Sequence, residues 1–293
     1  MMGVGIQVKR SQWTGAEELR RRAFYLLCSV APGLMSRLLM EQFLTPQRRG
    51  TSPREQAFRE SAQVLSIPHN GSELAGYAWG EGPTVLLVHG WEGRASNLRP
   101  FVAPLVQRGF RVVAFDLPGH GASPGTQTDL VDAGRAIRAA IAQVGPVQGV
   151  VAHSFGAAAT MLLLGWQPEV WAGRVVLVGA PAELRGMVAQ WVRARHLPER
   201  VIDKMQQVLA ARVGEPMEIF SLPTVAASMR LPGLVVHDRQ DPVAPFAGAE
   251  EVARRWRGAR LLATDGLGHR SPLRSPKVIQ EVAAFLAREE DSE

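Results

Sequence analysis

The spacing of hydrophobic positions along the chain changes near residue 64. After this point, short β-rich apolar runs alternate with longer segments in which apolar residues recur every three or four positions. The short runs predict strands at Leu74–Trp79, Thr84–His89, Arg111–Asp116, Gln148–His153, Arg174–Gly179, Gly233–Asp238 and Arg260–Thr264. The longer segments predict helices at Asn97–Gln107, Thr128–Val144, Phe155–Gly165, Phe246–Arg257 and Pro276–Arg288. Because such alternation is typical of a mainly parallel sheet covered on both faces, residues 64–293 are predicted to form one α/β domain.

Residues 1–63 show helical spacing only. Thr14 and Glu17 stand at capping-box spacing before a helix that runs to Val30, and further helices are predicted to begin at Pro32 and at Ser52-Pro53. We interpret this N-terminal helical extension as packed on the main domain. Contact with a membrane surface is the alternative interpretation, which we do not favour.

The alternation of strands and helices stops once within the domain. Between Pro181 and Arg230 it is replaced by helical segments rich in Arg, Met and Gln. An insertion after a central strand is where a lid over a site would emerge. Residues 181–230 are therefore predicted to form a helical cap.

Charge is distributed unevenly along the chain. The 33 Lys+Arg and 27 Asp+Glu give a net charge of +6, and residues 1–60 alone hold ten basic and five acidic residues. The remainder is thus nearly neutral and has no basic stripe interleaved with aromatics, which argues against a nucleic-acid partner. The single cysteine, Cys28, excludes a disulfide framework and a multi-thiolate metal site. The uncharged run Ala23–Ser36 is short and interrupted by Pro32-Gly33, so we expect a cytoplasmic protein.

A candidate nucleophile stands where a predicted strand meets a predicted helix. Ser154 follows the strand Gln148–His153 and precedes a strong helix former. The segment from Ala152 to Gly156 is a variant of G-x-S-x-G, in which small residues on both sides of the serine let strand and helix pass closely. In this context Ser154 is predicted to be the nucleophile.

Two backbone N–H groups are candidates to hold an oxyanion. Phe155 begins the helix after Ser154, so its N–H points toward the space above the serine hydroxyl. The strand Thr84–Val88 ends in His89-Gly90-Trp91, where Gly90 permits a sharp turn and the Trp91 N–H could face the same space. We expect Trp91 and Phe155 to form an oxyanion hole, with His89 and Gly90 supporting the turn.

A serine hydroxyl needs an imidazole base and an acid that orients it. Among seven histidines, His269 lies in a loop between the last strand and the last helix, from which it can reach the carboxyl edge of the sheet. The loop after Gly233–Asp238 offers Asp241 and Asp238 as the acid. Asp241 is favoured because it lies within the loop, whereas Asp238 ends the strand. Asp116 and Asp265 are lesser alternatives.

Taken together, these residues resemble the α/β-hydrolase family over Leu74–Arg288. Ser154, Asp241 and His269 follow the family's chain order, and His89-Gly90-Trp91 and Phe115–Ser123 are similar to two of its motifs. The resemblance implies a three-layer α/β/α sandwich with a mostly parallel sheet of about eight strands and a cap at 181–230. Ala152, where the family has glycine, and the N-terminal extension depart from its pattern.

The resemblance and the residues imply acyl transfer to water through Ser154, without a metal or organic cofactor. A serine at position 154 argues against the family's epoxide hydrolases and haloalkane dehalogenases, which use aspartate. We expect a carboxylesterase acting on a small to medium uncharged acyl substrate. A thioesterase, a short-chain lipase, an acyltransferase or a carbon–carbon bond hydrolase would use the same residues. A non-catalytic binding protein of this fold is disfavoured by the intact Ser154, Asp241 and His269.

Overall fold

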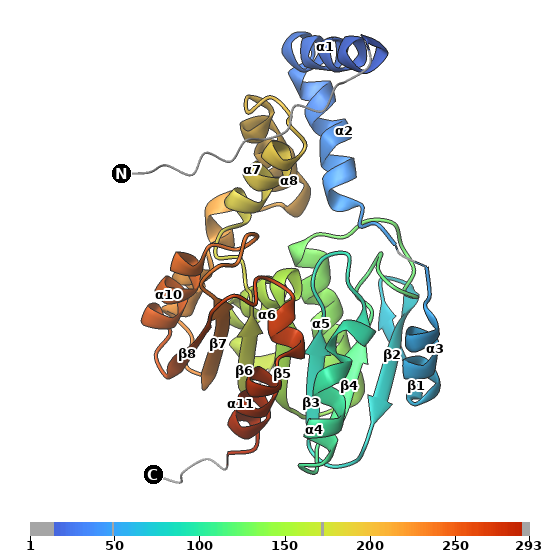
Figure 1. Ribbon diagram of the computed structural model, residues 1–293, viewed down its shortest axis with the longest axis vertical. Helices are drawn as coiled ribbons and strands as arrows, with labels where there is room; N and C mark the ends of the chain where they lie inside the picture. Colours follow the sequence, from blue (N-terminus) through green and yellow to red (C-terminus); the bar gives the residue numbers. More distant parts are fainter. Residues whose placement is uncertain (1–14, 49, 171–172, 289–293) are drawn as a thin grey trace.

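A computed structural model describes residues 15–48, 50–170 and 173–288 of the chain. Within these ranges, eight strands form one sheet in the order β1-β2-β4-β3-β5-β6-β7-β8 (Figure 1). The strands are β1 (Gln63–His69), β2 (Ser72–Trp79), β3 (Thr84–Val88), β4 (Arg111–Phe115), β5 (Val147–His153), β6 (Arg174–Val178), β7 (Gly233–Asp238) and β8 (Ala259–Thr264). β2 is antiparallel to both of its neighbours, and every other pairing is parallel.

Helices cover both faces of the sheet, because its strands are apolar on both sides. Leu86 and Val88 of β3 belong to one core, with α5 (Leu130–Val144), α6 (Ser154–Trp166) and α10 (Phe246–Arg255). Val85 and Leu87 belong to the opposite core, which includes residues of α4 (Val102–Val106) and α11 (Pro276–Leu286). The three-layer α/β/α fold predicted from the sequence is confirmed.

The seven predicted strands are all present, with ends displaced by at most two residues. β1 is an additional edge strand that the sequence analysis did not predict, and it contains Pro68. An edge position tolerates proline because β1 pairs with β2 alone. The helix predicted at Asn97–Gln107 begins instead as a 3₁₀ segment over Ala95–Phe101, where Pro100 cannot donate a backbone hydrogen bond.

The segment between β6 and β7 contains α7 (Leu184–Ala194), α8 (Val201–Val213) and α9 (Leu222–Ala226). Before the sheet come α1 (Gly15–Val30), α2 (Pro32–Leu44) and α3 (Pro53–Glu60). Ser52 caps α3 as its sequence suggests, because its hydroxyl accepts the Glu55 N–H. The predicted capping residue Thr14 lies outside the described residues.

Helix α1 lies at the end of the molecule beyond α7 and α8, and α2 packs along α8 on its way to the body (Figure 1). The rings of Phe43 and Trp191 meet edge to face at 5.6 Å between centroids. None of the described helices is by itself long and apolar enough to cross a bilayer. Glu18–Val30 and Pro32–Leu44 reach that length and composition together, but they are bent by 117°.

Trp256, which follows α10, provides a test of the core. Its side chain is 2% exposed and occupies the space beside Gly233, where a Cβ would lie 2.6 Å from the indole ring. The indole N–H also donates to the Leu231 carbonyl at 2.9 Å.

We expect Trp256→Ala to lower the free energy of unfolding by about 3–5 kcal/mol, because it leaves a large cavity. Urea denaturation followed by circular dichroism measures this loss. Trp166→Ala is the control, since Trp166 is 42% exposed and its removal should cost less. Equal losses for the two variants would contradict this account of the core.

Candidate active site

Ser154 occupies a strained turn between β5 and α6. Its φ of 51° lies in the left-handed region that non-glycine residues seldom adopt. Gly156, two residues later, lies so close to the end of β3 that a Cβ would stand 2.3 Å from the His89 carbonyl oxygen. A side chain is accommodated at position 152, because Ala152 lies within the sheet beside Val88. The departure from G-x-S-x-G is therefore accommodated in this fold.

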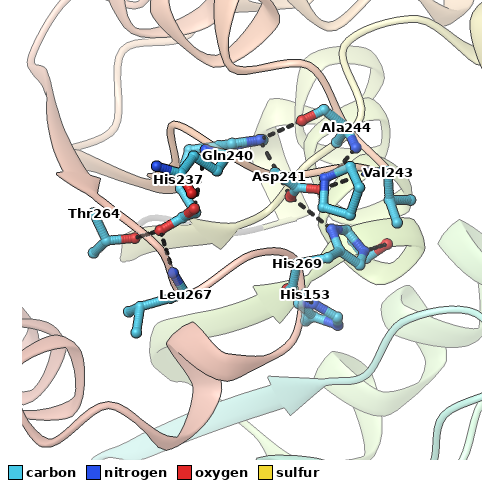
Figure 2. Close-up of polar contacts among 12 residues, drawn as sticks. His153, His237, Gln240, Asp241, Val243, Ala244, Thr264, Leu267 and His269 are labelled. Atoms are coloured by element: carbon cyan, nitrogen blue, oxygen red, sulfur yellow. Dashed lines mark hydrogen bonds and ion pairs between the residues drawn. The ribbon is translucent and has the colours of Figure 1, made fainter. Parts of the chain in front are cut away.

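A chain of hydrogen bonds joins Ser154, His269 and Asp241. Nε2 of His269 lies 2.9 Å from the Ser154 hydroxyl oxygen, and its Nδ1 lies 2.7 Å from Oδ2 of Asp241 (Figure 2). The three residues follow β5, β8 and β7, whose carboxyl ends share one edge of the sheet. The structure thus brings together the three residues that the sequence analysis nominated as nucleophile, base and acid.

Asp241 is held in place by its own loop. Its Oδ1 accepts the N–H groups of Val243 and Ala244 at 2.7 and 3.0 Å (Figure 2). Burial raises the pKa of Asp241, but the hydrogen bonds from His269, Ala244 and Val243 more than offset burial and hold the pKa below its usual range. Asp241 is therefore a carboxylate at neutral pH, able to orient the His269 imidazole.

Asp238, the alternative acid, does not contact His269. Its carboxylate accepts hydrogen bonds from the Thr264 hydroxyl at 2.7 Å, from the Leu267 N–H at 3.0 Å and from the Gln240 N–H at 3.0 Å. These bonds join the loop after β7 to the loop after β8, which carries His269. Asp238 accordingly positions the loops that hold the other two residues.

The lesser alternatives for the acid lie elsewhere. Asp116 is buried and accepts the N–H groups of Ala95 and Ala122, so it joins two loops on another part of the edge. Asp265 is exposed and lies 3.8 Å from Arg239. Neither aspartate is bonded to His269.

Two histidines that sequence reasoning did not assign to the site contact it directly. His237 donates from Nε2 to the Ala244 carbonyl at 2.8 Å and lies 3.5 Å from Oδ2 of Asp241. His153 donates from Nε2 to the carbonyl of His269 at 3.1 Å, and the two rings are 5.0 Å apart (Figure 2). Only their positions in the sequence could have indicated this role, because His153 is the last residue of β5 and His237 the last but one of β7, and both strands lead to this edge.

The segment His89-Gly90-Trp91 packs against the Ser154 turn. A Cβ on Gly90 would lie 2.9 Å from Cβ of Ser154, so only glycine permits this approach. His89 stabilises the turn by accepting the Leu117 N–H at Nε2 and donating from Nδ1 to the Gly90 carbonyl. The rings of Trp91 and Phe155 lie 5.1 Å apart, and both residues line the same cavity as Ser154.

A cavity of 320 Å³ opens beside Ser154. Its wall is mostly apolar and draws on three parts of the chain: Leu44 from α2, Leu184 and Trp191 from α7, and Trp91 and Phe155 from the body. Polar groups on the wall are few: Thr128 and Gln190, and the charged Asp129 and Arg195, besides Ser154 itself. Across the part of the chain that the structure describes, no three His, Cys, Asp or Glu side chains are grouped to hold a metal ion.

Comparisons of this chain with known proteins agree with the geometry of the site. The sequence model of the family described as "Alpha/beta hydrolase family" matches residues 85–282. A "Serine hydrolase-like protein" of Homo sapiens is 30% identical over 165 residues, which cover 54% of this chain and 78% of that protein. A "Pimeloyl-[acyl-carrier protein] methyl ester esterase" of Xanthomonas campestris is 27% identical over 232 residues, covering 65% of this chain and 89% of the relative.

Among solved structures, a membrane phospholipase A described as a bacterial virulence factor superposes with a TM-score of 0.63 at 19% identity. The superposition covers 92% of this chain and 98% of that structure. Residues 63–293 alone would account for less than that share, so the similarity in fold extends into the N-terminal helices.

Three buried histidines near this edge remain neutral over a wide pH range. Burial lowers the pKa of His89 to about 4, and burial together with a neighbouring imidazole lowers the pKa values of His120 and His153 to about 3. In the unfolded chain a histidine titrates near pH 6.5. Unfolding therefore takes up protons between about pH 6 and 4, and stability falls as the pH falls through that window.

We expect His120→Asn to make stability less dependent on pH between 6 and 4. The asparagine amide can replace the Nδ1 donor that binds the Pro118 carbonyl, but it cannot be protonated. Each histidine contributes up to about 1.4 kcal/mol per pH unit to the change of unfolding free energy with pH. In the variant this slope should therefore decrease by up to that amount. Urea denaturation at several pH values measures it, and an unchanged slope would contradict the buried, neutral state of His120.

Proposed function

Because the chain belongs to the α/β-hydrolase family, we propose that it hydrolyses carboxylic esters of apolar acyl compounds through an acyl-enzyme on Ser154. The observation that carries the proposal is the hydrogen-bonded series Ser154, His269 and Asp241 beside an apolar cavity. Hydrolase activity is also supported by the esterase relatives. Ester substrates and the covalent intermediate on Ser154 are the parts of the proposal that the experiments below test.

In the proposed reaction, Nε2 of His269 accepts the Ser154 hydroxyl proton as the oxygen attacks the ester carbonyl. The N–H groups of Phe155 and Trp91 hold the oxyanion, each worth about 3–4 kcal/mol of transition-state stabilisation. The imidazolium then protonates the leaving alkoxide, and the alcohol departs. Water, deprotonated by His269, attacks the acyl-enzyme and releases the acid and free Ser154. Asp241 keeps the Nδ1 proton of His269 directed toward itself throughout.

The cavity supports an uncharged acyl group of small to medium size. Its 320 Å³ stands near the lower end of the roughly 300–1,000 Å³ of small-molecule pockets. Leu184, Trp191 and Phe155 are among the large apolar side chains on the wall that would contact an acyl chain. The methyl ester esterase and the phospholipase among the similar proteins are consistent with acyl esters as the class to test first.

We expect a fluorophosphonate probe to label the wild-type protein and to leave Ser154→Ala unlabelled. The reagent traps an activated serine regardless of the natural substrate, so it tests the nucleophile separately from specificity. A panel of p-nitrophenyl esters and matched thioesters, with and without an added alcohol acceptor, then separates hydrolysis from acyl transfer. An unlabelled wild-type protein would contradict the proposed function, and equal labelling of the variant would contradict the role of Ser154.

The two aspartates should respond differently to the same substitution. Asp241→Asn is expected to lower kcat by about 10⁴-fold, because an amide cannot hold His269 in the required tautomer. Asp238→Asn should lower the urea midpoint through its bonds to Thr264 and Leu267, with a much smaller effect on kcat. Steady-state kinetics and urea denaturation of both variants measure these effects. A larger loss of kcat in Asp238→Asn than in Asp241→Asn would contradict the assignment of Asp241 as the acid.

A further inference from the structure

The outer face of α1 is apolar, although no described residue covers it. Leu19, Leu26, Leu27 and Val30 are all exposed, with Val30 at 73% and Leu19 at 69%. The opposite face of α1 carries Cys28, which is completely buried. In a helix that packs on one side and meets water on the other, the outer side is expected to be polar. The outer face of α1 departs from this rule over about three turns, from Leu19 to Val30.

Arginines border this apolar face on both sides. At about 100° per residue, the four exposed apolar side chains fall within an arc of about 100°. By the same spacing, Arg20 lies just beyond one edge of the arc and Arg22 just beyond the other. Both arginines are exposed. Arg22 also pairs with Glu18 at 3.1 Å. An apolar stripe with a cation at each border is found in helices that lie in the interface of a bilayer.

Two further exposed leucines lie on α2. Leu34 and Leu38 are exposed at 61% and 46%, beside the exposed Arg37. Of the nine large hydrophobic side chains that are exposed in the described ranges, six thus belong to α1 and α2. We call α1 and α2 together the arm and this set the arm stripe; its members are Leu19, Leu26, Leu27, Val30, Leu34 and Leu38. Exposed large hydrophobic side chains concentrated on one part of a protein indicate a surface that binds a partner.

The exposure does not arise from a loose extension, because the inner side of the arm is fixed to the rest of the molecule. The Tyr25 hydroxyl donates to the His196 carbonyl in the loop between α7 and α8. Met35, Leu39 and Met40 of α2 are buried in the core that includes α8. The arm therefore holds its outer side in a fixed orientation at the end of the molecule (Figure 1).

We propose that the arm stripe docks onto the surface of an anionic lipid bilayer. Along α1 and α2 the sequence has four arginines and three glutamates, and the exposed Arg20, Arg22 and Arg37 lie on the helices that carry the stripe. These arginines are available to pair with anionic headgroups. A bilayer satisfies both features at once, since it buries the leucines in the acyl region and pairs the arginines with headgroups.

Docking through the arm also relates the bilayer to the cavity. The last turn of α2 contributes Phe43 and Leu44 to the wall beside Ser154. The helix that carries Leu34 and Leu38 at one end therefore ends at the cavity. Binding of the arm to a bilayer does not depend on the proposed esterase activity, and it can be tested in a protein that lacks the Ser154 hydroxyl.

The experiment is co-sedimentation of full-length Ser154→Ala with vesicles of phosphatidylcholine alone or with 30% phosphatidylglycerol. We expect binding to the anionic vesicles that weakens as salt is raised. Leu26→Ser combined with Val30→Ser should lower the partition coefficient by at least about tenfold, because two apolar side chains no longer enter the interface. Val64→Ser in β1 is the matched control, since Val64 is also 73% exposed but lies outside the arm, and it should bind as the parent does.

A second variant tests the charges. Arg20→Glu combined with Arg22→Glu should weaken binding to anionic vesicles by at least about tenfold. Sedimentation equilibrium of the same proteins reports self-association. Failure to bind, equal binding to neutral vesicles, or binding that survives the Leu26 and Val30 substitutions overturns the proposal. A dimer that dissociates with those substitutions while no form binds vesicles also overturns it and assigns the stripe to a second copy.

Discussion

The geometry of the site depends on how closely α6 passes the end of β3. Gly156 lets the helix reach the His89 carbonyl, and this approach requires the left-handed turn at Ser154 that raises the hydroxyl above the sheet edge. A strained residue of this kind costs about 1–3 kcal/mol. The cost is offset by α6 itself, whose residues from Ser154 to Leu164 are buried. A well-packed helix thus holds the serine in a conformation that the isolated turn would not keep.

The partners of Ser154 are held by a different means, because they lie on loops. His269 and Asp241 follow neighbouring strands, and Asp238 joins their loops through Thr264 and Leu267. His153 adds a bond to the His269 backbone from the strand that leads to the serine. Each loop is therefore fixed by buried polar groups that belong to the adjacent strand ends. This arrangement gives the imidazole one orientation between the hydroxyl and the carboxylate.

Sequence reasoning succeeded where the signal is local. The elbow is contiguous in the chain, so strand, small residues and helix former could be recognised together, and the parallel sheet follows from the alternation of apolar runs. β1 was not predicted; it lies at the edge of the sheet, and its pairing with β2 alone, which accommodates Pro68, is a tertiary feature. The contacts of His153 and His237 join residues that are far apart in the sequence, so they could not be predicted from it. Which side of α1 is exposed depends on which side packs against the rest of the molecule, and that is a tertiary feature.

The charge of the chain gains a physical meaning from the position of the arm. α2 has 13 residues and spans about 20 Å between its first turn and Phe43 and Leu44 on the cavity wall. Arg20 and Arg22 of α1 are exposed, so salt and water screen their effect on the potential at Ser154. Their effect is confined to the surface on which they lie, beside the exposed leucines. The basic excess of the sequence thus belongs to residues 1–60, which precede the sheet, whereas the rest of the chain, which carries Ser154, Asp241 and His269, is nearly neutral.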